Sequence, residues 1–597
     1  MKQLEHSRLY VEIQQAKNAG EAFKPISAFL LVGKSSTHNE VIQMQFHNPF
    51  EVSILEYNNS VITDLGTSIM LHLPLNEMCL QLELLEKPID YLITISDNQK
   101  IAPNKNIRHY HGIIKDDARS MVAITFAEDE IMGLVVTDRG NYDLVWDKEH
   151  KVYVFYNSKN LKHKPEFSCA TDAKNVSTVY SPRVLFQELE FSVRASTDKR
   201  VRLYFETEYD IFQTRGSVLS VETFITGLYN QVALIYRNES IITLLSQIHI
   251  WNTSDPYSAS TTGGLLTQFQ NTRTSFNGDL GQLLTFRNIG GGQAAGFNGL
   301  CNINIEDRLS VAMLYNSYSD VPTYSWTVYV VTHEFGHLFG SRHTHACVWN
   351  GDNTAIDGCS AVEGNCQRPG NPSVGGTIMS YCHLQNIGVN FNLGFGSQPG
   401  NVIRNSVSNA ACLISLLGTD IIGASCTGTY TFSNLPSGAS FVHWEVGAGL
   451  TIVGSNASNC TVQRSNNVDD PEYAEVRYIY SINQQQYTIS KTVMARILPV
   501  IALGIVDATT HQAQAIGQVG KLYYFKANMP ANLRPLIQEY EWDLIVDGMV
   551  NDFTGENTSH DPFKFDIAGI YTLSLRVHDG CEYSKWVSTN VIIESEY

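Results

Sequence analysis

Several features that would place this chain in a common class are scarce in its sequence. Only 17% of the 597 residues are charged, and 59 acidic residues against 41 basic ones give a net charge of −18. No cluster of Lys and Arg occurs, which argues against a nucleic-acid partner because phosphate binding needs concentrated positive charge. The longest apolar runs, such as Leu498–Val506, fall far below the roughly 18–20 residues that cross a bilayer. An integral membrane protein is therefore not expected.

Apolar residues, by contrast, are plentiful. They make up 43% of the chain, which suffices for several packed cores and argues against a largely disordered protein. At roughly 100–200 residues per domain, three to five domains are expected. Short alternating strands such as Met121–Phe126 predict a β-rich first domain over 1–197, whose end, Leu161–Asp198, has the polar composition of a linker.

The middle and the end of the chain show two further patterns. A strand at Val201–Glu208 and a helical apolar pattern from Val218 predict an α/β domain over 198–417. After it, short strands alternate with turns rich in Gly, Asn, Ser and Asp. Their spacing predicts two β-sandwich modules, at 418–497 and 498–597.

Cysteine is unevenly distributed. Six of the eleven cysteines lie between positions 301 and 412, namely Cys301, Cys347, Cys359, Cys366, Cys382 and Cys412. This even cluster predicts three disulfides formed in an oxidising compartment, and six thiols allow 15 pairings. No apolar signal-peptide segment follows Met1–His6, so we expect a secreted protein whose signal is missing from this chain.

One short segment carries most of the chemical information. In the pattern HExxHxxGxxH, His333 and His337 are four residues apart, so on a helix both imidazoles face the same way. Gly340 allows the chain to leave the helix and bring His343 back as a third ligand. Three protein ligands leave one position open, as in catalytic zinc sites, and Glu334 is placed to hold a zinc-activated water. HExxH alone arises by chance in helices, but the longer pattern rarely does.

A second motif follows 36 residues after the third histidine. The segment Gly375–Tyr381 places Met379 in a turn led by glycines. With the zinc motif, it resembles the Met-turn of the metzincin metalloendopeptidases. Flanking segments such as Asp279–Thr285 and Ser310–Met313 resemble the reprolysin (adamalysin-like) group, over roughly residues 198–417. The resemblance implies a twisted mixed sheet with a zinc helix, one catalytic Zn²⁺, and His333, His337 and His343 as its ligands.

The same resemblance bears on the cysteines and on a second metal. It implies a Cys301–Cys412 disulfide, and a short Cys359–Cys366 loop that closes on itself would leave Cys347 to pair with Cys382. Thr344 stands where reprolysins usually carry Asp. The acids Glu206, Glu208 and Asp210 do not match the register of the group's calcium site, so no Ca²⁺ is predicted.

Two further residues have competing interpretations. Tyr381 matches the position of an extra tyrosine ligand in astacin-like and serralysin-like metzincins, where it would bind zinc or the oxyanion; alternatively it lines the cleft. The segment around Arg108–Ile114 resembles a reprolysin propeptide, and Cys169 near its end would then bind the zinc and keep the enzyme latent. The alternative is a Cys79–Cys169 disulfide.

Together these observations predict a secreted zinc endopeptidase that is made as a zymogen. Its domains would be a propeptide, a metzincin catalytic domain, an immunoglobulin-like module and a polycystic-kidney-disease-like module. Glu334 would be the general base, and an apolar pocket around Tyr381–Gly396 would select protein substrates. The alternative is a non-catalytic surface adhesion or binding protein that retains a metzincin fold and binds through its C-terminal modules.

Overall fold

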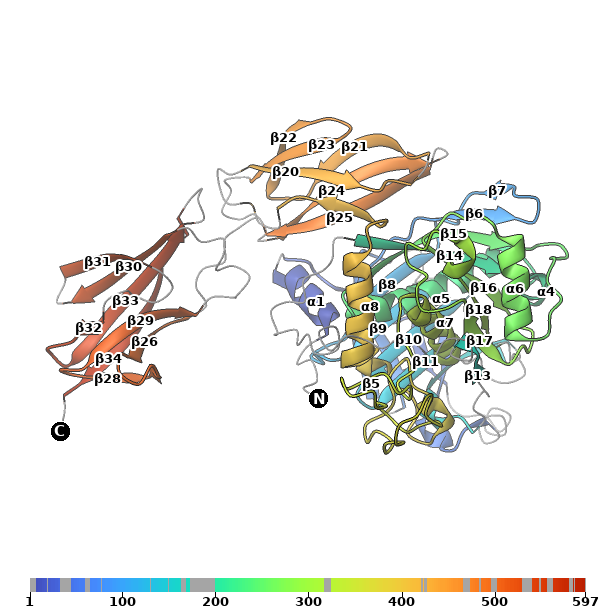
Figure 1. Ribbon diagram of the computed structural model, residues 1–597, viewed down its shortest axis with the longest axis horizontal. Helices are drawn as coiled ribbons and strands as arrows, with labels where there is room; N and C mark the ends of the chain where they lie inside the picture. Colours follow the sequence, from blue (N-terminus) through green and yellow to red (C-terminus); the bar gives the residue numbers. More distant parts are fainter. Residues whose placement is uncertain are drawn as a thin grey trace. The chain divides into compact units, whose positions relative to one another are not determined.

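The computed structural model divides the chain into two compact units, the first built from the described residues up to 171 and over 199–414, the second from those beyond 414 (Figure 1). The residues that the structure describes are 7–18, 20–32, 45–58, 65–76, 78–128, 130–148, 150–162, 168–171, 199–315, 324–419, 422, 427–436, 438–464, 473–482, 485–494, 502–528, 539–546, 549–555, 562–578, 583–584 and 586–595. The predicted linker therefore lies mostly outside the described residues, and the predicted domain boundaries stay predictions.

The N-terminal part of the first unit is a ten-stranded, mainly antiparallel sheet that follows helix α1 (Arg8–Asn18). In sheet order its strands are β1 (Lys24–Ile26), β4 (Ser68–Leu75), β5 (Met78–Glu86), β8 (Arg108–Ile114), β9 (Met121–Phe126), β10 (Ile131–Thr137), β11 (Gly140–Asp147), β12 (Val152–Asn157), β3 (Ser53–Tyr57) and β2 (Phe29–Leu31). The strand expected at Met121–Phe126 is confirmed as β9.

A second, mixed sheet forms the rest of the first unit. Its strands run in the order β13 (Ser168–Cys169), β17 (Gly291–Ala294), β18 (Leu309–Met313), β16 (Leu280–Thr285), β14 (Lys199–Thr207), β15 (Ile242–Ile250), β6 (Leu92–Ile95) and β7 (Lys100–Ile101). The helices are α4 (Tyr209–Arg215), α5 (Val218–Asn238), α6 (Thr262–Thr272), α7 (Tyr324–Leu338) and α8 (Ser397–Asn409). Strand β17 runs antiparallel to β18 on one side and pairs in parallel with β13 on the other.

Helices α5 and α7 lie between the two sheets and contact both of them (Figure 1). Alternation along β9 shows why the first sheet is covered on both faces. Met121 and Ala123 point into the core shared with the helices, whereas Val122 and Ile124 point into a second core on the opposite face. The N-terminal region and the α/β region therefore fold around one continuous core.

Helix α5 is the long apolar helix of that core. Ser217 caps its start by accepting a hydrogen bond from the backbone of Ser220. Among the described residues, α5 is the one helix that is long and apolar enough to cross a membrane by length and composition. However, 78% of its most apolar window is buried within the unit, as in the core helices of many proteins.

A strand from the N-terminal region also extends the second sheet. Strand β6 pairs in parallel with β15, with Leu92 opposite Gln247 and Ile95 opposite Ile250. The hydroxyl of Thr94 lies 2.9 Å from the Nδ1 atom of His249 across this junction. The two regions are thus joined by backbone pairing as well as by side-chain packing.

Two histidines of β8 are buried where the first sheet meets α5. His111 Nε2 donates to the carbonyl of Asn230 at 2.9 Å, and His109 Nδ1 lies 3.0 Å from the Thr125 hydroxyl. Burial is the main cause that lowers the pKa of each imidazole to about 3, and the adjacent Lys87 lowers that of His111 further. Both rings are therefore neutral in the folded unit.

This burial predicts that acid destabilises the first unit. Because the folded-state pKa values lie below the usual 6.5, the stabilisation is complete above pH 6.5 and is lost as the pH falls toward 3. At pH 4 the cost is about 3 kcal/mol for each histidine, from about 1.4 kcal/mol per pKa unit. Denaturant unfolding of the full chain between pH 7 and 4 measures it. In a His109→Asn, His111→Gln variant this part of the pH dependence should disappear; an unchanged slope would contradict the assignment.

The described residues of the second unit form four groups of paired strands. The first two have the strand orders β19 (Ile414–Leu417), β20 (Thr427–Ser433), β23 (Asn459–Arg464), β22 (Leu450–Ser455), and β21 (Ser440–Val446), β24 (Tyr473–Ile482), β25 (Gln485–Met494). The other two have the orders β27 (Ala513–Gln514), β26 (Ala502–Asp507), β29 (Leu522–Asn528), β32 (Phe563–Lys564), and β28 (Ile516–Gln518), β34 (Val587–Glu594), β33 (Gly569–His578), β30 (Glu539–Val546), β31 (Met549–Gly555). Cys460 is a buried free thiol, while Cys426 and Cys581 lie outside the described residues.

Candidate active site

The HExxH segment forms the last turns of α7, as the sequence predicts. The helix ends at Leu338, and Gly340 follows in a left-handed conformation with φ of 111°, which a residue with a side chain adopts only at a cost. The chain then turns so that His343 lies beside His333 and His337. All three imidazoles are fully buried.

The Nε2 atoms of the three histidines converge. His333 Nε2 lies 3.0 Å from His343 Nε2, and His337 Nε2 lies 3.1 Å from both of the others. The three Nδ1 atoms instead donate hydrogen bonds away from this point. His333 donates to the carbonyl of Ile378 (2.8 Å) and His337 to the carbonyl of Ser341 (2.7 Å). His343 donates to the carboxylate of Glu363 (2.7 Å). A neutral imidazole that donates from Nδ1 has a lone pair on Nε2, so three lone pairs meet at one point.

These residues fit a metal ion. Burial, together with the two neighbouring imidazoles, holds the pKa of His333 well below its usual value, so the ring stays neutral and can act as a ligand. Converging lone pairs repel one another unless a cation lies between them. Tetrahedral Zn²⁺ with Zn–N bonds of about 2.0–2.1 Å separates its nitrogen ligands by about 3.3–3.4 Å, close to the spacing found here.

Glu334 lies beside this cluster and faces strand β17. Its side chain is fully buried, and burial raises the pKa of its carboxyl to about 8. A Cβ atom at Gly292 would lie 2.4 Å from Glu334 Oε1, so this glycine of the edge strand leaves the space that the carboxylate occupies.

The turn that contains Met379 packs against helix α7. A Cβ atom at Gly336 would lie 2.7 Å from the sulfur of Met379. The turn can therefore pack closely against α7 because Gly336 has no side chain. The backbone of Thr344 donates to the Met379 carbonyl at 3.0 Å. His333, at the start of the zinc motif, also bonds to the carbonyl of Ile378. The turn is therefore held by a residue at the start of the motif and by Thr344, which directly follows its end.

Cys169 reaches the same point from the N-terminal region. Strand β13 pairs with strand β17, with Ser168 opposite Gly291 and Cys169 opposite Gly292. The Cys169 thiol lies 3.4 Å from His337 Nε2 and 3.6 Å from Glu334 Oε2. The ligand atoms of Cys169 and the three histidines all lie within 4.8 Å of one another.

These contacts exclude one interpretation of Cys169. Both Cys169 and Cys79 are free thiols, so the alternative of a disulfide between them is wrong. Burial, and then the charge of Glu334, raises the pKa of the Cys169 thiol to about 12. A thiolate at this position therefore requires a cation, which a metal ion among the histidines would supply.

Tyr381 contacts the Cys169 segment through its hydroxyl. The hydroxyl accepts a hydrogen bond from the backbone N–H of Cys169 at 2.8 Å, and its ring centroid lies 4.8 Å from that of His343. The Tyr381 ring therefore lies beside the third histidine, with its hydroxyl bound to the backbone of Cys169. Its suggested role toward metal or oxyanion stays a prediction.

Glu363 is a residue of the site that sequence analysis missed. Its Oε1 atom accepts from His343 Nδ1 at 2.7 Å and lies 3.0 Å from His345 Nε2. The resemblance leads one to expect Asp at position 344, where this chain has Thr. The absence of that carboxylate was the signal in the sequence that another residue would supply one near the third histidine. Nothing in the sequence indicates that the carboxylate comes from a residue 20 positions later.

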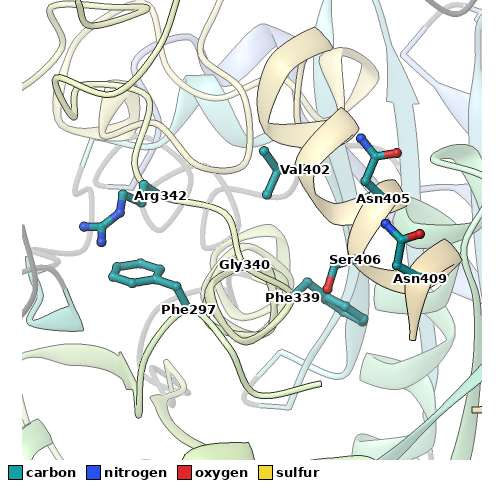
Figure 2. A pocket seen from close by; sticks show the side chains of 8 residues that line it. All are labelled: Phe297, Phe339, Gly340, Arg342, Val402, Asn405, Ser406 and Asn409. Atoms are coloured by element: carbon teal, nitrogen blue, oxygen red, sulfur yellow. The ribbon is translucent and has the colours of Figure 1, made fainter. Parts of the chain in front are cut away.

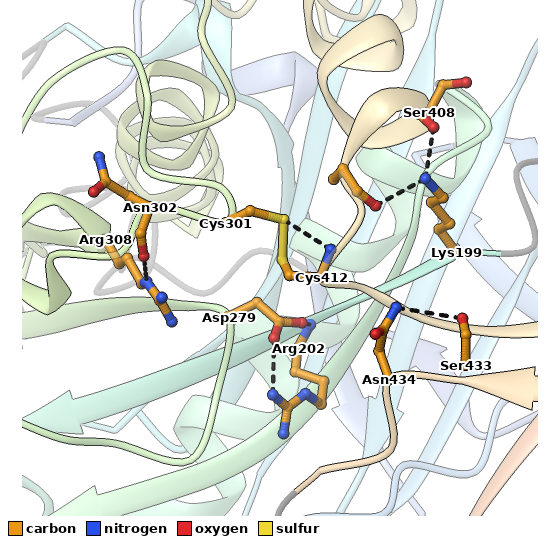
Figure 3. Close-up of a disulfide and its surroundings, with 11 residues drawn as sticks. Lys199, Arg202, Asp279, Cys301, Asn302, Arg308, Ser408, Cys412, Ser433 and Asn434 are labelled. Atoms are coloured by element: carbon orange, nitrogen blue, oxygen red, sulfur yellow. Dashed lines mark hydrogen bonds and ion pairs between the residues drawn. A yellow bond between two sulfur atoms is a disulfide. The ribbon is translucent and has the colours of Figure 1, made fainter.

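The disulfide predictions are partly wrong. Cys301–Cys412 is confirmed and joins the loop before β18 to the segment after α8 (Figure 3). Nearby, Lys199 Nζ donates to the carbonyls of Ser408 (2.6 Å) and Ala410 (2.8 Å). The predicted Cys359–Cys366 loop does not form: the pairs are Cys347–Cys366 and Cys359–Cys382. A backbone bridge between Ala346 and Glu363 brings Cys347 to Cys366 instead.

The three acids weighed for a calcium site all bind side chains or backbone within the protein. Glu206 pairs with Arg273 at 2.6 Å, Glu208 pairs with Arg287 at 2.6 Å, and Asp210 accepts from the backbone of Phe286 at 2.7 Å. These contacts give the three carboxylates structural roles.

The region predicted to select substrate is only partly apolar and buried. Phe391 belongs to the core, whereas Leu384 is 46% exposed. A cavity of about 230 Å³ lies elsewhere, between the end of the zinc-motif helix and α8 (Figure 2). Its lining includes Phe297, on which the guanidinium of Arg342 stacks at 4.1 Å, and the polar side chains Asn405, Ser406 and Asn409.

Comparison with known proteins agrees with the site. Residues 197–390 match the model of metallo-peptidase family M12 (Reprolysin_5). No curated protein matches the chain. Metalloproteinase-II from Bacteroides fragilis aligns at 13% identity over 50% of this chain and 90% of its own, with a TM-score of 0.29. A two-domain fibronectin type-III segment of chicken tenascin aligns at 11% identity over 30% of this chain and 97% of its own, with a TM-score of 0.16. The family match supports a metalloprotease, and family M12 implies a metal ion, typically zinc.

Proposed function

We propose that the protein is a zinc-dependent endopeptidase of the reprolysin-like metzincin type, made as a latent zymogen. The observation that carries the proposal is the convergence of three buried Nε2 lone pairs, 3.0–3.1 Å apart, beside a buried carboxylate. The match over residues 197–390 supports it independently of that geometry.

The residues of the cleft have distinct roles in this proposal. His333, His337 and His343 hold the zinc ion, which supplies Lewis-acid activation of a water molecule and of the scissile carbonyl. Glu334 takes the proton of the attacking water and passes it to the leaving amine. An extended peptide adds to the edge of β17 through backbone hydrogen bonds, which explains how many sequences can be bound in one orientation.

Latency would follow from the segment that now occupies this edge. Strand β13 covers β17 where a substrate would pair, and the Cys169 sulfur is the fourth ligand atom of the cluster. A thiolate held there would fill the position that the attacking water needs. The contact from Thr171 Oγ1 to Glu334 Oε2, at 3.4 Å, places a second group of the same segment against the general base.

We also propose that the protein is secreted and acts on other proteins. Three disulfides around the site are typical of an oxidising compartment. Residues 1–197 would be the propeptide and 198–417 the catalytic domain. The modules at 418–497 and 498–597 would bind a surface or matrix.

Metal dependence is the direct test. The full chain carrying Cys169→Ala should cleave casein, lose that activity with an excess of a zinc chelator, and regain it when zinc is added back. The same chelator saturated with zinc beforehand is the control and should not inhibit. Cleavage that persists in the chelator would contradict the proposed function.

The second candidate function is a non-catalytic adhesion protein. It predicts no cleavage under any of these conditions, together with binding through residues 418–597. The intact set of three histidines and Glu334 favours the enzyme, because an inactive descendant has no need to retain the general base.

A further inference from the structure

The third histidine of the site is held differently from the other two. His333 and His337 donate from Nδ1 to backbone carbonyls, but His343 donates to the carboxylate of Glu363. A hydrogen bond to an ionised acceptor is roughly twice as strong as one between neutral groups. His343 is also the one of the three histidines that lies outside helix α7, so its direction depends on contacts made in the loop.

A neighbouring imidazole completes this arrangement. The His345 ring stacks on His343 with centroids 4.9 Å apart and planes 9° from parallel. Its Nε2 atom reaches the same oxygen of Glu363 at 3.0 Å. The carboxylate therefore bridges two stacked rings, so that neither can rotate without breaking a contact.

The backbone fixes Glu363 in turn. Its N–H donates to the carbonyl of His345 at 3.1 Å, and its carbonyl accepts from the N–H of Cys347 at 2.8 Å. Three residues later, Cys366 forms a disulfide with Cys347. The carboxylate is thus attached to a short closed loop that is joined by two hydrogen bonds to the segment that follows the third histidine.

We propose that Glu363 is a positioning residue for the metal site, and that the loop closed by Cys347–Cys366 holds it in place. By accepting from Nδ1, Glu363 fixes the tautomer of His343 with its lone pair on Nε2, orients the ring toward the metal and makes the nitrogen a stronger ligand. This inference rests on the proposed zinc site and adds a residue to it that the zinc motif does not contain.

Zinc affinity of the full chain is the quantity to measure, by competition with a chromogenic chelator in the Cys169→Ala background. Glu363→Ala should weaken zinc binding about 10–100-fold, the usual effect of losing such an outer partner. Glu363→Gln should weaken it less, because the amide oxygen still accepts from His343 without carrying charge. Glu306→Gln, which removes an exposed carboxylate elsewhere, should leave the affinity unchanged.

Cobalt provides a readout that a merely structural role would not change. In Co²⁺-substituted protein, the visible ligand-field bands should shift in Glu363→Gln, because the basicity of His343 changes while the fold is kept. If the Glu363→Ala variant does not fold, the comparison of Glu363→Gln with the parent chain still tests the proposal through zinc affinity and the cobalt bands. Unchanged bands and affinity in Glu363→Gln would overturn the proposal.

A pair of disulfide variants tests the role of the loop. Replacing Cys347 and Cys366 with Ser should lower zinc affinity in the same direction as Glu363→Ala, whereas replacing Cys301 and Cys412 should not. Equal effects of both variants would contradict this part of the proposal. If the chain with Glu363 intact binds no zinc, the proposed function fails; if it binds zinc and Glu363→Ala binds equally well, only the present inference fails.

Discussion

Replacing Glu334 with Gln in the full chain carrying Cys169→Ala should lower kcat/KM for a peptide substrate by about 10²–10⁴-fold, the usual contribution of a general base. The amide has nearly the shape of the carboxylate but cannot take a proton from water. Gly292 leaves room for either group, since its missing Cβ would otherwise lie 2.4 Å from Glu334 Oε1.

Zinc content separates this effect from a loss of the metal. Glu334 is not among the residues whose ligand atoms gather around the metal position, so the variant should still bind one zinc ion per chain. Its thermal unfolding midpoint should not fall, because an uncharged amide of nearly the same shape replaces a buried carboxyl whose pKa is raised to about 8. Activity close to that of the Cys169→Ala parent, at full zinc content, would exclude Glu334 as the base.

Removing the thiol of Cys169 should have the opposite effect on activity. The segment stays tethered in the same chain, which strengthens its binding by about 10²–10⁴-fold, but Cys169→Ala removes its sulfur from the histidine cluster. We therefore expect the peptidase activity of the full chain to rise by about 10²-fold, the low end of that range. The reason is that the sulfur, 3.4 Å from His337 Nε2, would otherwise occupy the position that water needs. A continuous assay with a quenched peptide, comparing the two full-length proteins, measures the change.

A second free thiol supplies the matched control. Cys79 is exposed and lies on β5, so Cys79→Ala should leave the latent activity as it is. Cys169→Ser should activate as Ala does, since a hydroxyl is a poor zinc ligand at neutral pH. Equal, low activity of the wild type and Cys169→Ala would assign Cys169 a structural role on the β17 edge.

Much of the site could be predicted because its geometry is local. The spacing of His333 and His337 fixes their common direction on any helix, and Gly340 marks the residue where the chain must turn. The alternation along Met121–Phe126 likewise predicts a strand wherever the partner strands lie. These features follow from backbone periodicity and from the conformational freedom of single residues.

Contacts between distant segments could not be predicted in this way. The pairing of Cys347 with Cys366 and the pairing of β6 with β15 each join segments whose sequences carry no mark of one another. The contact of Cys169 with the histidines was implied by the propeptide resemblance alone, beside the alternative of a disulfide with Cys79. The sequence allowed 15 pairings of the six clustered cysteines. The family resemblance indicated the correct partner for Cys301 and Cys412 but the wrong partners for the other four cysteines. Spatial proximity, set by how the loops close, decided among them.

The sequence by itself determined that this chain carries three histidines and a glutamate in a zinc-site pattern, because four-residue helical spacing is a local property. Only the tertiary structure decided what surrounds them: a thiol from the N-terminal region beside His337 Nε2, and the carboxylate of Glu363 behind His343. The physical reason is that a ligand set depends on short-range backbone geometry, whereas its supporting contacts depend on the packing of one shared core and on loops closed by disulfides.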